Sequence, residues 1–263
     1  DYLLAQADLF RSKGFTVHLC AKEVHPTVCE DVHDYEYLKD RVSKDDLVIY
    51  HYGIYDDGYE LIGSSRAKQK IFYYHNQTPP EYFDSYDQGT ADALRKGLQQ
   101  IATANEYFSK LVANSPYTIA QQKSRRTLVD AEWSWLPPMI SDQIVFQTPE
   151  LGGREYTFCI LGRMVPHKMI HKSIKLFRAY QKFDPSARMV IIGSGEGAYF
   201  EECKALIDNT LGIDHFSEIS DELRQKLLFS SKSLLNLSSH EGFALPVIEA
   251  MSAGCIPFYG TST

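Results

Sequence analysis

A strand–helix–strand pattern near the C-terminal end of the chain limits the fold more than any other feature of the sequence. Residues 233–238 form a short apolar run of strand length, and residues 255–259 form a second one. Between these runs Pro246 suits the first turn of a helix, where its missing N–H would be unpaired anyway, and Gly254 suits the helix end. A strand, a helix and a further strand in this order predict a parallel sheet covered by helices.

The same alternation of strand-like and helical patterns runs along the whole chain. Further apolar runs of strand length occur at 16–20, 47–50, 71–75, 111–113, 156–161 and 188–192. Helical periodicity is found over 91–108 and 169–183. The glycine pair at 152–153 indicates a linker. We therefore predict an α/β fold of two doubly wound, Rossmann-like domains, residues 1–150 and residues 151–263.

The composition argues against several classes of protein. The 34 acidic residues outnumber the 27 basic ones, and a net charge of -7 argues against a nucleic-acid-binding protein. The five cysteines lack paired spacing, which indicates reduced thiols rather than a disulfide framework. No apolar run approaches the roughly 18 residues of a membrane span, and no signal-peptide pattern is found. We expect a cytoplasmic protein, and peripheral contact with the inner face of the membrane is left open.

Two carboxylates flank the start of the predicted helix. Glu241 lies in the preceding loop and Glu249 lies one turn into the helix. The backbone N–H groups of Phe243, Ala244 and Leu245 point out of the helix N-terminus, where a phosphate is stabilised. Carboxylates accept hydrogen bonds from vicinal hydroxyl groups. A nucleotide sugar, which carries phosphates between two sugar-like ends, would use all of these features.

Cations and glycines follow two other strand-like runs. Gly162 and Arg163 come directly after a strand, and Lys168 lies five residues beyond Arg163, so both cations can converge on a phosphate. Gly193 and Gly195 permit either a plain tight turn or the close approach of a ligand. Because ligands bind at the carboxyl ends of strands in such sheets, we expect these loops to line one crevice with the loop after residue 238.

Two histidines raise the alternative of a metal site. His167 and His171 are four residues apart, as in zinc-binding helices, but Lys168 stands where such motifs carry a glutamate. A cation beside a metal opposes its binding, so we predict no metal site.

The motifs Glu241-Gly-Phe-Ala-Leu-Pro246 and Glu249-Ala-Met-Ser-Ala-Gly254 resemble those of the retaining glycosyltransferases of family 4. The resemblance implies the GT-B fold, in which two Rossmann-like domains face each other across a cleft. Ala244 replaces a residue that is frequently glycine in the family. Relative to that family the chain looks clipped at both ends, without the first strand, its glycine-rich loop and the C-terminal helices.

The resemblance also assigns roles to single residues. It implies that Glu241 and His75 face the donor sugar, that Glu249 binds the ribose hydroxyls, and that the diphosphate contacts Arg163 and Lys168. The donor-binding residues that it implies are Gly162, Gly193, Gly195, Gly242, Phe243, Ala244, Leu245 and Glu249. Aromatic residues at 50–55 and 82–83 suit either an acceptor sugar or ordinary packing.

The sequence thus predicts a metal-independent enzyme that moves a hexose from a UDP- or GDP-sugar to a saccharide or other hydroxyl acceptor, with no cofactor besides this co-substrate. The two cations beside the diphosphate favour departure of the leaving group, and the departing phosphate could accept the proton of an acceptor that attacks on the same face, which predicts retention of the anomeric configuration. A double displacement through a carboxylate nucleophile, for which Glu241 is the candidate, would also retain it, and both routes stay open. Two alternatives stay open: a GT-B sugar phosphorylase, and a non-catalytic GT-B subunit that binds a saccharide or a partner.

Overall fold

The computed structural model describes residues 2–24, 28, 31–125, 131–139 and 153–260. Its backbone contacts divide the chain into two compact units. The first consists of Asp1–Pro79 and Asp92–Ser141, and the second of Pro80–Ala91 and Asp142–Thr263. No helix among the described residues has both the length and the apolar character needed to cross a membrane.

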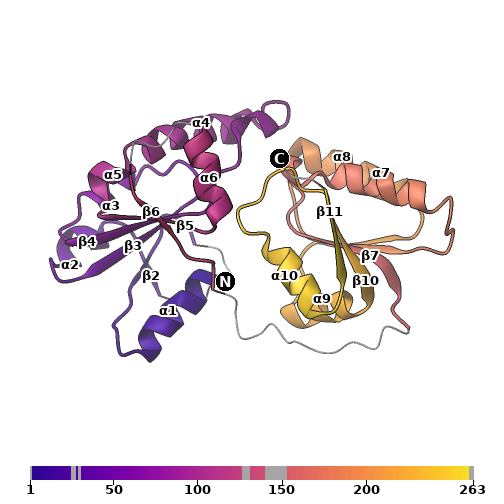
Figure 1. Ribbon diagram of the computed structural model, residues 1–263, viewed down its shortest axis with the longest axis horizontal. Helices are drawn as coiled ribbons and strands as arrows, with labels where there is room; N and C mark the ends of the chain where they lie inside the picture. Colours follow the sequence, from indigo (N-terminus) through magenta and orange to yellow (C-terminus); the bar gives the residue numbers. More distant parts are fainter. Residues whose placement is uncertain (1, 25–27, 29–30, 126–130, 140–152, 261–263) are drawn as a thin grey trace. The chain divides into compact units, whose positions relative to one another are not determined.

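A parallel four-stranded sheet forms the centre of the first unit (Figure 1). The strands are β3 (Leu47–Tyr52), β4 (Gln69–Tyr74), β5 (Lys110–Ala113) and β6 (Trp133–Trp135), in that spatial order. A separate parallel pair consists of β1 (Leu19–Cys20) and β2 (Val32–His33). The helices are α1 (Tyr2–Ser12), α2 (Tyr37–Arg41), α3 (Tyr59–Gly63), α4 (Gln88–Ala102), α5 (Ala104–Tyr107) and α6 (Pro116–Arg125).

Alternating aromatic residues give this sheet one buried face. Tyr50 pairs with Phe72 and Tyr52 with Tyr74 across β3 and β4, and all four side chains are buried. Successive residues of a strand point to opposite faces, so these four share a face, which packs against α3, α4 and α5. The intervening positions, which include His51 and Tyr73, occupy the opposite face.

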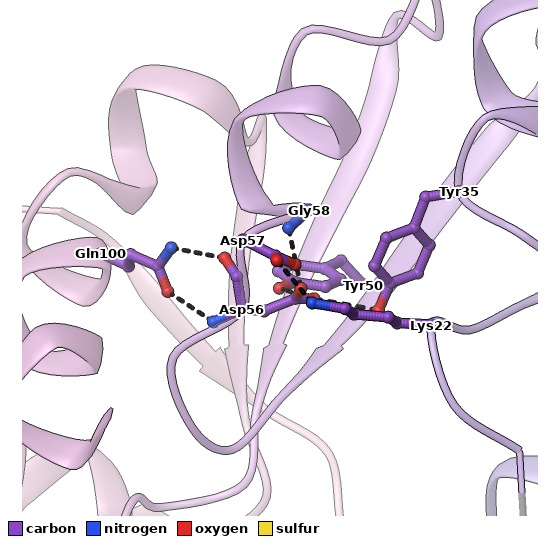
Figure 2. A network of polar contacts seen from close by, with 7 residues as sticks. All are labelled: Lys22, Tyr35, Tyr50, Asp56, Asp57, Gly58 and Gln100. Atoms are coloured by element: carbon purple, nitrogen blue, oxygen red, sulfur yellow. Dashed lines mark hydrogen bonds and ion pairs between the residues drawn. The ribbon is translucent and has the colours of Figure 1, made fainter. Parts of the chain in front are cut away.

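The loop between β3 and α3 is fixed by hydrogen bonds to Asp56 (Figure 2). The Asp56 carboxylate accepts hydrogen bonds from the hydroxyls of Tyr50 at 2.7 Å and Tyr35 at 3.0 Å, and from the Gly58 N–H at 2.8 Å. The Gln100 side chain of α4 pairs with the Asp56 backbone at 3.0 and 2.6 Å. Burial and the nearby Asp56 carboxylate raise the pKa of Tyr50, so its hydroxyl stays a donor. The carboxyl end of β3 is therefore held against α4.

The second unit has a five-stranded parallel sheet in the order β11-β10-β7-β8-β9. Its strands are β7 (Tyr156–Leu161), β8 (Met189–Ile192), β9 (Ile213–Phe216), β10 (Ser231–Asn236) and β11 (Ile256–Tyr259). The chain adds strands on one side of β7 and then continues on its other side, so the order reverses between β7 and β10. Ligands of doubly wound folds bind at such a switch point, outside the carboxyl ends of the strands.

Helices cover both faces of this sheet (Figure 1). One face packs against α7 (Ile170–Tyr180) and α8 (Gly197–Asp208) through Ile160, Met189 and Ile191. The other packs against α9 (Asp221–Phe229) and α10 (Leu245–Ser252) through Cys159, Val190 and Leu234. The strands are apolar on both faces because both are buried.

Residues 80–91, which include the 3-10 turn η1 (Pro80–Tyr82), belong to the second unit although the chain on either side belongs to the first. The Tyr86 ring packs edge-on against Tyr199 with centroids 5.1 Å apart, and its hydroxyl donates to Glu202 at 3.0 Å. Tyr82 and Phe83 lie with their ring centroids 6.3 and 6.1 Å from that of His167. We call residues 80–91 the arm.

The predicted α/β fold with parallel sheets is confirmed, and most deviations concern boundaries. The strand predicted at 16–20 is reduced to β1, and the helix predicted over 91–108 is two helices, α4 and α5, which meet at Thr103. The sequence prediction missed β2, β6 and β9. It did not foresee the arm, and the predicted boundary near residue 150 lies outside the described residues.

Candidate active site

Two loops at the carboxyl ends of β7 and β8 are joined backbone to backbone. The Gly162 N–H donates to Ile192 O at 3.0 Å, and the Met164 N–H donates to Ser194 O at 2.8 Å. A Cβ atom on Gly193 would lie 2.0 Å from Gly162 O, and one on Gly195 would lie 2.9 Å from Met164 O. The packing of the two loops therefore requires glycine at both positions. This packing alone explains the two glycines, and no bound ligand is needed to account for them.

The loop after β10 docks on the 3-10 turn η2 (Pro166–Lys168), which follows β7. The backbone carbonyl of His167 accepts hydrogen bonds from the Ser239 N–H at 2.9 Å, the Ser239 hydroxyl at 3.1 Å and the Ser238 hydroxyl at 3.3 Å. Met169 follows the turn with left-handed backbone angles, φ 52° and ψ 33°, and leads the chain into α7. These bonds hold the loops after β7 and β10 side by side at the switch point of the sheet.

This docking brings together two predicted catalytic residues, Lys168 and Glu241. The Lys168 ammonium donates to both carboxylate oxygens of Glu241, at 2.7 and 2.8 Å. Both side chains are largely shielded from solvent, with exposed fractions of 19% and 20%. An ion pair between partly buried groups is less screened than one at the surface and fixes the orientation of both.

The N-terminus of α10 begins beside this ion pair. Ala244 adopts left-handed angles, φ 61° and ψ 48°, and Pro246 lies in the first helical turn. Within the described part of the chain, no protein acceptor lies within hydrogen-bonding distance of the N–H groups of Phe243 and Ala244. These donors and the positive end of the helix dipole are available to an anion.

Glu249 lies one turn further along α10 and is half-buried. Burial raises the pKa of its carboxyl group, which the positive charge of Arg224 opposes. No described side chain donates a hydrogen bond to this carboxylate. The group is therefore a partly desolvated acceptor with unused capacity.

Arg163 is the exposed cation of the site. It follows Gly162, whose φ of 138° is accessible mainly to glycine and turns the chain out of β7. No ion pair involves Arg163 among the residues that the structure describes. Its guanidinium thus has its planar set of donors available for a phosphate.

Comparison with known proteins finds similarity to glycosyltransferases. Residues 142–260 match the family model "Glycosyl transferases group 1". The match falls within the second unit, Asp142–Thr263. A GDP-mannose:cellobiosyl-diphosphopolyprenol alpha-mannosyltransferase from Xanthomonas oryzae pv. oryzae is 31% identical over 104 residues, which cover 38% of this chain and 27% of the relative.

Solved structures of glycosyltransferases share the fold. A mutant of S. aureus TarM, solved in complex with Fondaparinux, alpha-GlcNAc-glycerol and UDP, matches with a TM-score of 0.64 and 20% identity, over 86% of this chain and 43% of TarM. Sucrose-phosphate synthase from Thermosynechococcus elongatus matches with a TM-score of 0.74 and 14% identity, over 99% of this chain and 75% of that one. The α/β fold with parallel sheets that these glycosyltransferases have is confirmed for both units. The chain spans less than half of the length of TarM and of the mannosyltransferase.

All predicted site residues except His75 lie in the second unit. The structure joins Gly162 to the glycine turn of Gly193 and Gly195, and Lys168 to Glu241, whereas no described contact links Glu249 to either cation. The ligand-binding roles of these residues stay predictions.

His75 lies in the first unit, directly after β4. Its Nε2 lies 3.0 Å from Nδ1 of His51, and Nε2 of His51 lies 2.9 Å from the amide oxygen of Gln6 in α1. Burial lowers the pKa of His75 to about 3 and that of His51 to about 4. Both imidazoles are therefore neutral at neutral pH.

Sequence reasoning missed several residues that shape the site. Ser238 and Ser239 anchor the loop that carries Glu241, and the serine pair before the motif was the signal that could have pointed to them. The left-handed conformation of Met169 has no signal in the sequence because methionine rarely adopts it. The structure gives His167 and His171 different neighbours: the hydroxyl oxygen (Oη) of Tyr199 lies 3.0 Å from His171 Nδ1, whereas His167 packs beside the arm.

Proposed function

We propose that the full protein transfers a hexose from a UDP- or GDP-sugar to a saccharide or other hydroxyl acceptor, with retention of configuration and without a metal ion. The observation that carries this proposal is the Lys168–Glu241 ion pair at the N-terminus of α10, next to the glycine-rich loops of the switch point. It combines cations, exposed backbone donors and carboxylates within one glycosyltransferase domain.

The two cations serve the leaving diphosphate. Lys168 is held in place by Glu241 before any ligand arrives, and Arg163 is exposed nearby on the same loop. Preorganised positive charge at a developing anion increases the reaction rate by a factor of about 10²–10³. A metal ion would otherwise supply this charge. The proposal therefore assigns charge stabilisation to Arg163, Lys168 and the α10 N-terminus.

The Glu241 contacts favour one of the two routes to retention. Both carboxylate oxygens of Glu241 accept hydrogen bonds from Lys168, which lowers their reactivity as nucleophiles. A double displacement through this carboxylate is therefore disfavoured. The alternative is attack on the same face, with the departing phosphate accepting the proton of the acceptor hydroxyl.

The similar proteins point to two candidate nucleotides, GDP and UDP. The mannosyltransferase relative uses GDP-mannose by its name, and TarM was solved with UDP. The proposal covers both donors. Glu249 is assigned to the ribose hydroxyls, which the two nucleotides share, because its carboxylate has unused acceptor capacity.

The test is to incubate the full-length protein with a panel of UDP- and GDP-sugars in the presence of EDTA, and to measure release of the nucleoside diphosphate. We expect turnover of at least one donor, and proton NMR should show an α-linked first product from an α-linked donor. A β-linked product contradicts retention, and loss of activity in EDTA contradicts metal independence. Phosphate-dependent cleavage indicates the phosphorylase, whereas no turnover and no thermal shift with any donor favours the non-catalytic subunit.

A pair of variants tests the ribose assignment. Glu249→Ala removes an ionised hydrogen-bond acceptor worth about 1.5–3 kcal/mol and should weaken binding of the free nucleotide by roughly 10-fold to 150-fold. Glu201→Ala, which removes an exposed carboxylate from α8, should leave the affinity unchanged. Calorimetry measures both, and equal affinities for the two variants would contradict the assignment.

A further inference from the structure

The face of the first sheet opposite the aromatic core carries polar contacts that link Gln6, His51 and His75. His51 and Tyr73 are register partners on β3 and β4, and His75 lies two residues beyond Tyr73, so the three side chains share one face. Their rings are neighbours, with the Tyr73 centroid 5.0 Å from that of His51 and 4.8 Å from that of His75.

The backbone and ring of His75 are fixed independently of any ligand. The His75 N–H donates to Tyr52 O at 2.9 Å, and the Asn114 side chain donates to His75 O at 3.1 Å. The Tyr73 ring that packs beside the imidazole is held by its hydroxyl, which donates to Leu136 O at 2.7 Å. The side chain of His75 therefore has one well-defined place on the sheet.

The contacts also decide which nitrogen of each histidine carries the proton. Gln6 Oε1 only accepts hydrogen bonds, so Nε2 of His51, 2.9 Å away, must be protonated. Nδ1 of a neutral His51 is then an acceptor, and it lies 3.0 Å from Nε2 of His75. The two rings are nearly parallel at 18° with centroids 5.2 Å apart, a separation that places them edge to edge, as an N–H···N bond requires.

We propose that His51 is a positioning residue that holds His75 in its neutral Nε2–H tautomer, so that Nδ1 of His75 is the nitrogen that accepts a hydrogen bond. Gln6 completes the relay by fixing the tautomer of His51. In this state His75 acts toward a hydroxyl group as an acceptor, and it does not act as an imidazolium acid. The part of this inference that concerns a sugar hydroxyl rests on the proposed function, whereas the tautomer does not.

The tautomer is tested directly by a long-range proton–nitrogen correlation spectrum of the full chain labelled with ¹⁵N-histidine at pH 7. The His75 signals are those lost in His75→Gln. We expect the shift of a protonated nitrogen at Nε2 and of an unprotonated nitrogen at Nδ1. The opposite pattern, or the pattern of an imidazolium, would overturn the proposal.

Two substitutions test whether His51 imposes this state. His51→Leu removes the acceptor and should give His75 a mixture of tautomers, whereas His51→Asn places an amide oxygen near the position of Nδ1 and should restore the Nε2–H form. Tyr73→Phe tests the packing contribution separately, because it keeps a ring beside both histidines and removes only the hydroxyl that bonds to Leu136 O. A wild-type His75 spectrum in a folded His51→Leu variant would overturn the proposal.

Turnover then tests the functional part. With a donor that the wild type uses, His51→Leu should lower kcat about tenfold, the equivalent of one hydrogen bond, and His51→Asn should recover most of the loss. The affinity for free nucleotide should be unchanged, because the proposed nucleotide contacts lie in the second unit. Full kcat in His51→Leu overturns the positioning role. If no donor is turned over by the wild type, the proposed function fails while the spectrum still decides the tautomer.

Discussion

Backbone strain in this chain is concentrated at residues next to the predicted site. Among the described non-glycine residues, positive φ occurs at Asn76, Met169 and Ala244, with values of 65°, 52° and 61°. Asn76 follows His75, Met169 follows Lys168, and Ala244 lies inside the motif that begins at Glu241. Strained conformations persist where the surrounding structure fixes them, and they cluster at functional sites. The strain therefore supports the site assignment independently of the motifs.

Ala244→Gly should stabilise the protein by up to about 1 kcal/mol. A left-handed conformation costs a residue with a Cβ atom about 1–2 kcal/mol, and glycine recovers this at the expense of extra freedom in the unfolded chain. The measurement is the urea midpoint. Ala205→Gly is the matched control: this alanine is exposed within α8, so the same substitution should there lower the stability by about 1 kcal/mol. Destabilisation by both variants would contradict the assigned strain.

The sequence indicates the unusual conformation of Ala244 but does not indicate the contact between Lys168 and Glu241. The motif comparison marks Ala244 as a position that is often glycine, which is a signal of positive φ. Lys168 and Glu241 are 73 residues apart, and no local pattern states that their side chains meet. Their contact depends on the order of β7 and β10 in the sheet and on the docking of the serine pair, which are tertiary features.

At the scale of elements, a buried arginine fixes the end of α10. Arg154 precedes β7, is 7% exposed, and donates to Ala253 O at 3.0 Å, to Gly254 O at 3.3 Å and to Ser231 O. The carbonyls at a helix C-terminus lack partners within the helix, and a cation there also complements the helix dipole. The same side chain thus ties α10 to β10, and the position of the helix N-terminus follows from it.

Arg154→Met should destabilise the second unit by about 3 kcal/mol or more. The substitution keeps an apolar stem but leaves buried carbonyl groups without their charged donor, and each such bond contributes about 1.5–3 kcal/mol. Arg154→Lys should recover only part of this, because an ammonium lacks the planar fork. Urea denaturation measures the loss. Arg178→Met on the exposed surface of α7 is the control and should change the stability by less than about 0.5 kcal/mol. Equal stability of the Arg154 and Arg178 variants would refute the capping role.

The prediction of elements succeeded where burial gives continuous apolar runs and failed elsewhere. β7 and β8 are buried on both faces and read as apolar runs. β9 was missed because Asp214 and His215 interrupt it, and the structure satisfies them with Arg188, Tyr156 and the Gly193 carbonyl. The role of Arg154 was hidden because the residue follows a glycine pair that reads as a linker.

At the scale of the whole molecule, both units bury neutral histidines. Burial is the main cause that lowers the pKa of His51 to about 4 and the pKa values of His75 and His167 to about 3. The unfolded chain takes up protons at these residues below about pH 6.5, whereas the native state does not. The stabilising contribution of these neutral histidines is therefore fully present above pH 6.5. It is lost as the pH falls through that value toward the native pKa values.

We expect the free energy of unfolding to decrease as the pH is lowered from 7 to 5. Each of these histidines contributes up to about 1.4 kcal/mol of this decrease per pH unit. His51→Asn removes one of the three groups and should reduce the difference between the two pH values by about 2 kcal/mol. Urea titrations at both pH values measure this. An unchanged pH difference in the variant would show that His51 is not a neutral group in the native state.

The arm gives the order of synthesis a consequence for folding. Tyr86 leaves the ribosome 113 residues before Tyr199, the difference between their positions in the sequence. At about 5–20 residues per second, Tyr86 waits roughly 6–23 s for Tyr199, and Tyr82 and Phe83 wait roughly 4–17 s for His167. The nascent chain thus carries three aromatic rings whose packing partners have not yet been made, and a chaperone that recognises exposed aromatic residues can bind the arm during this time.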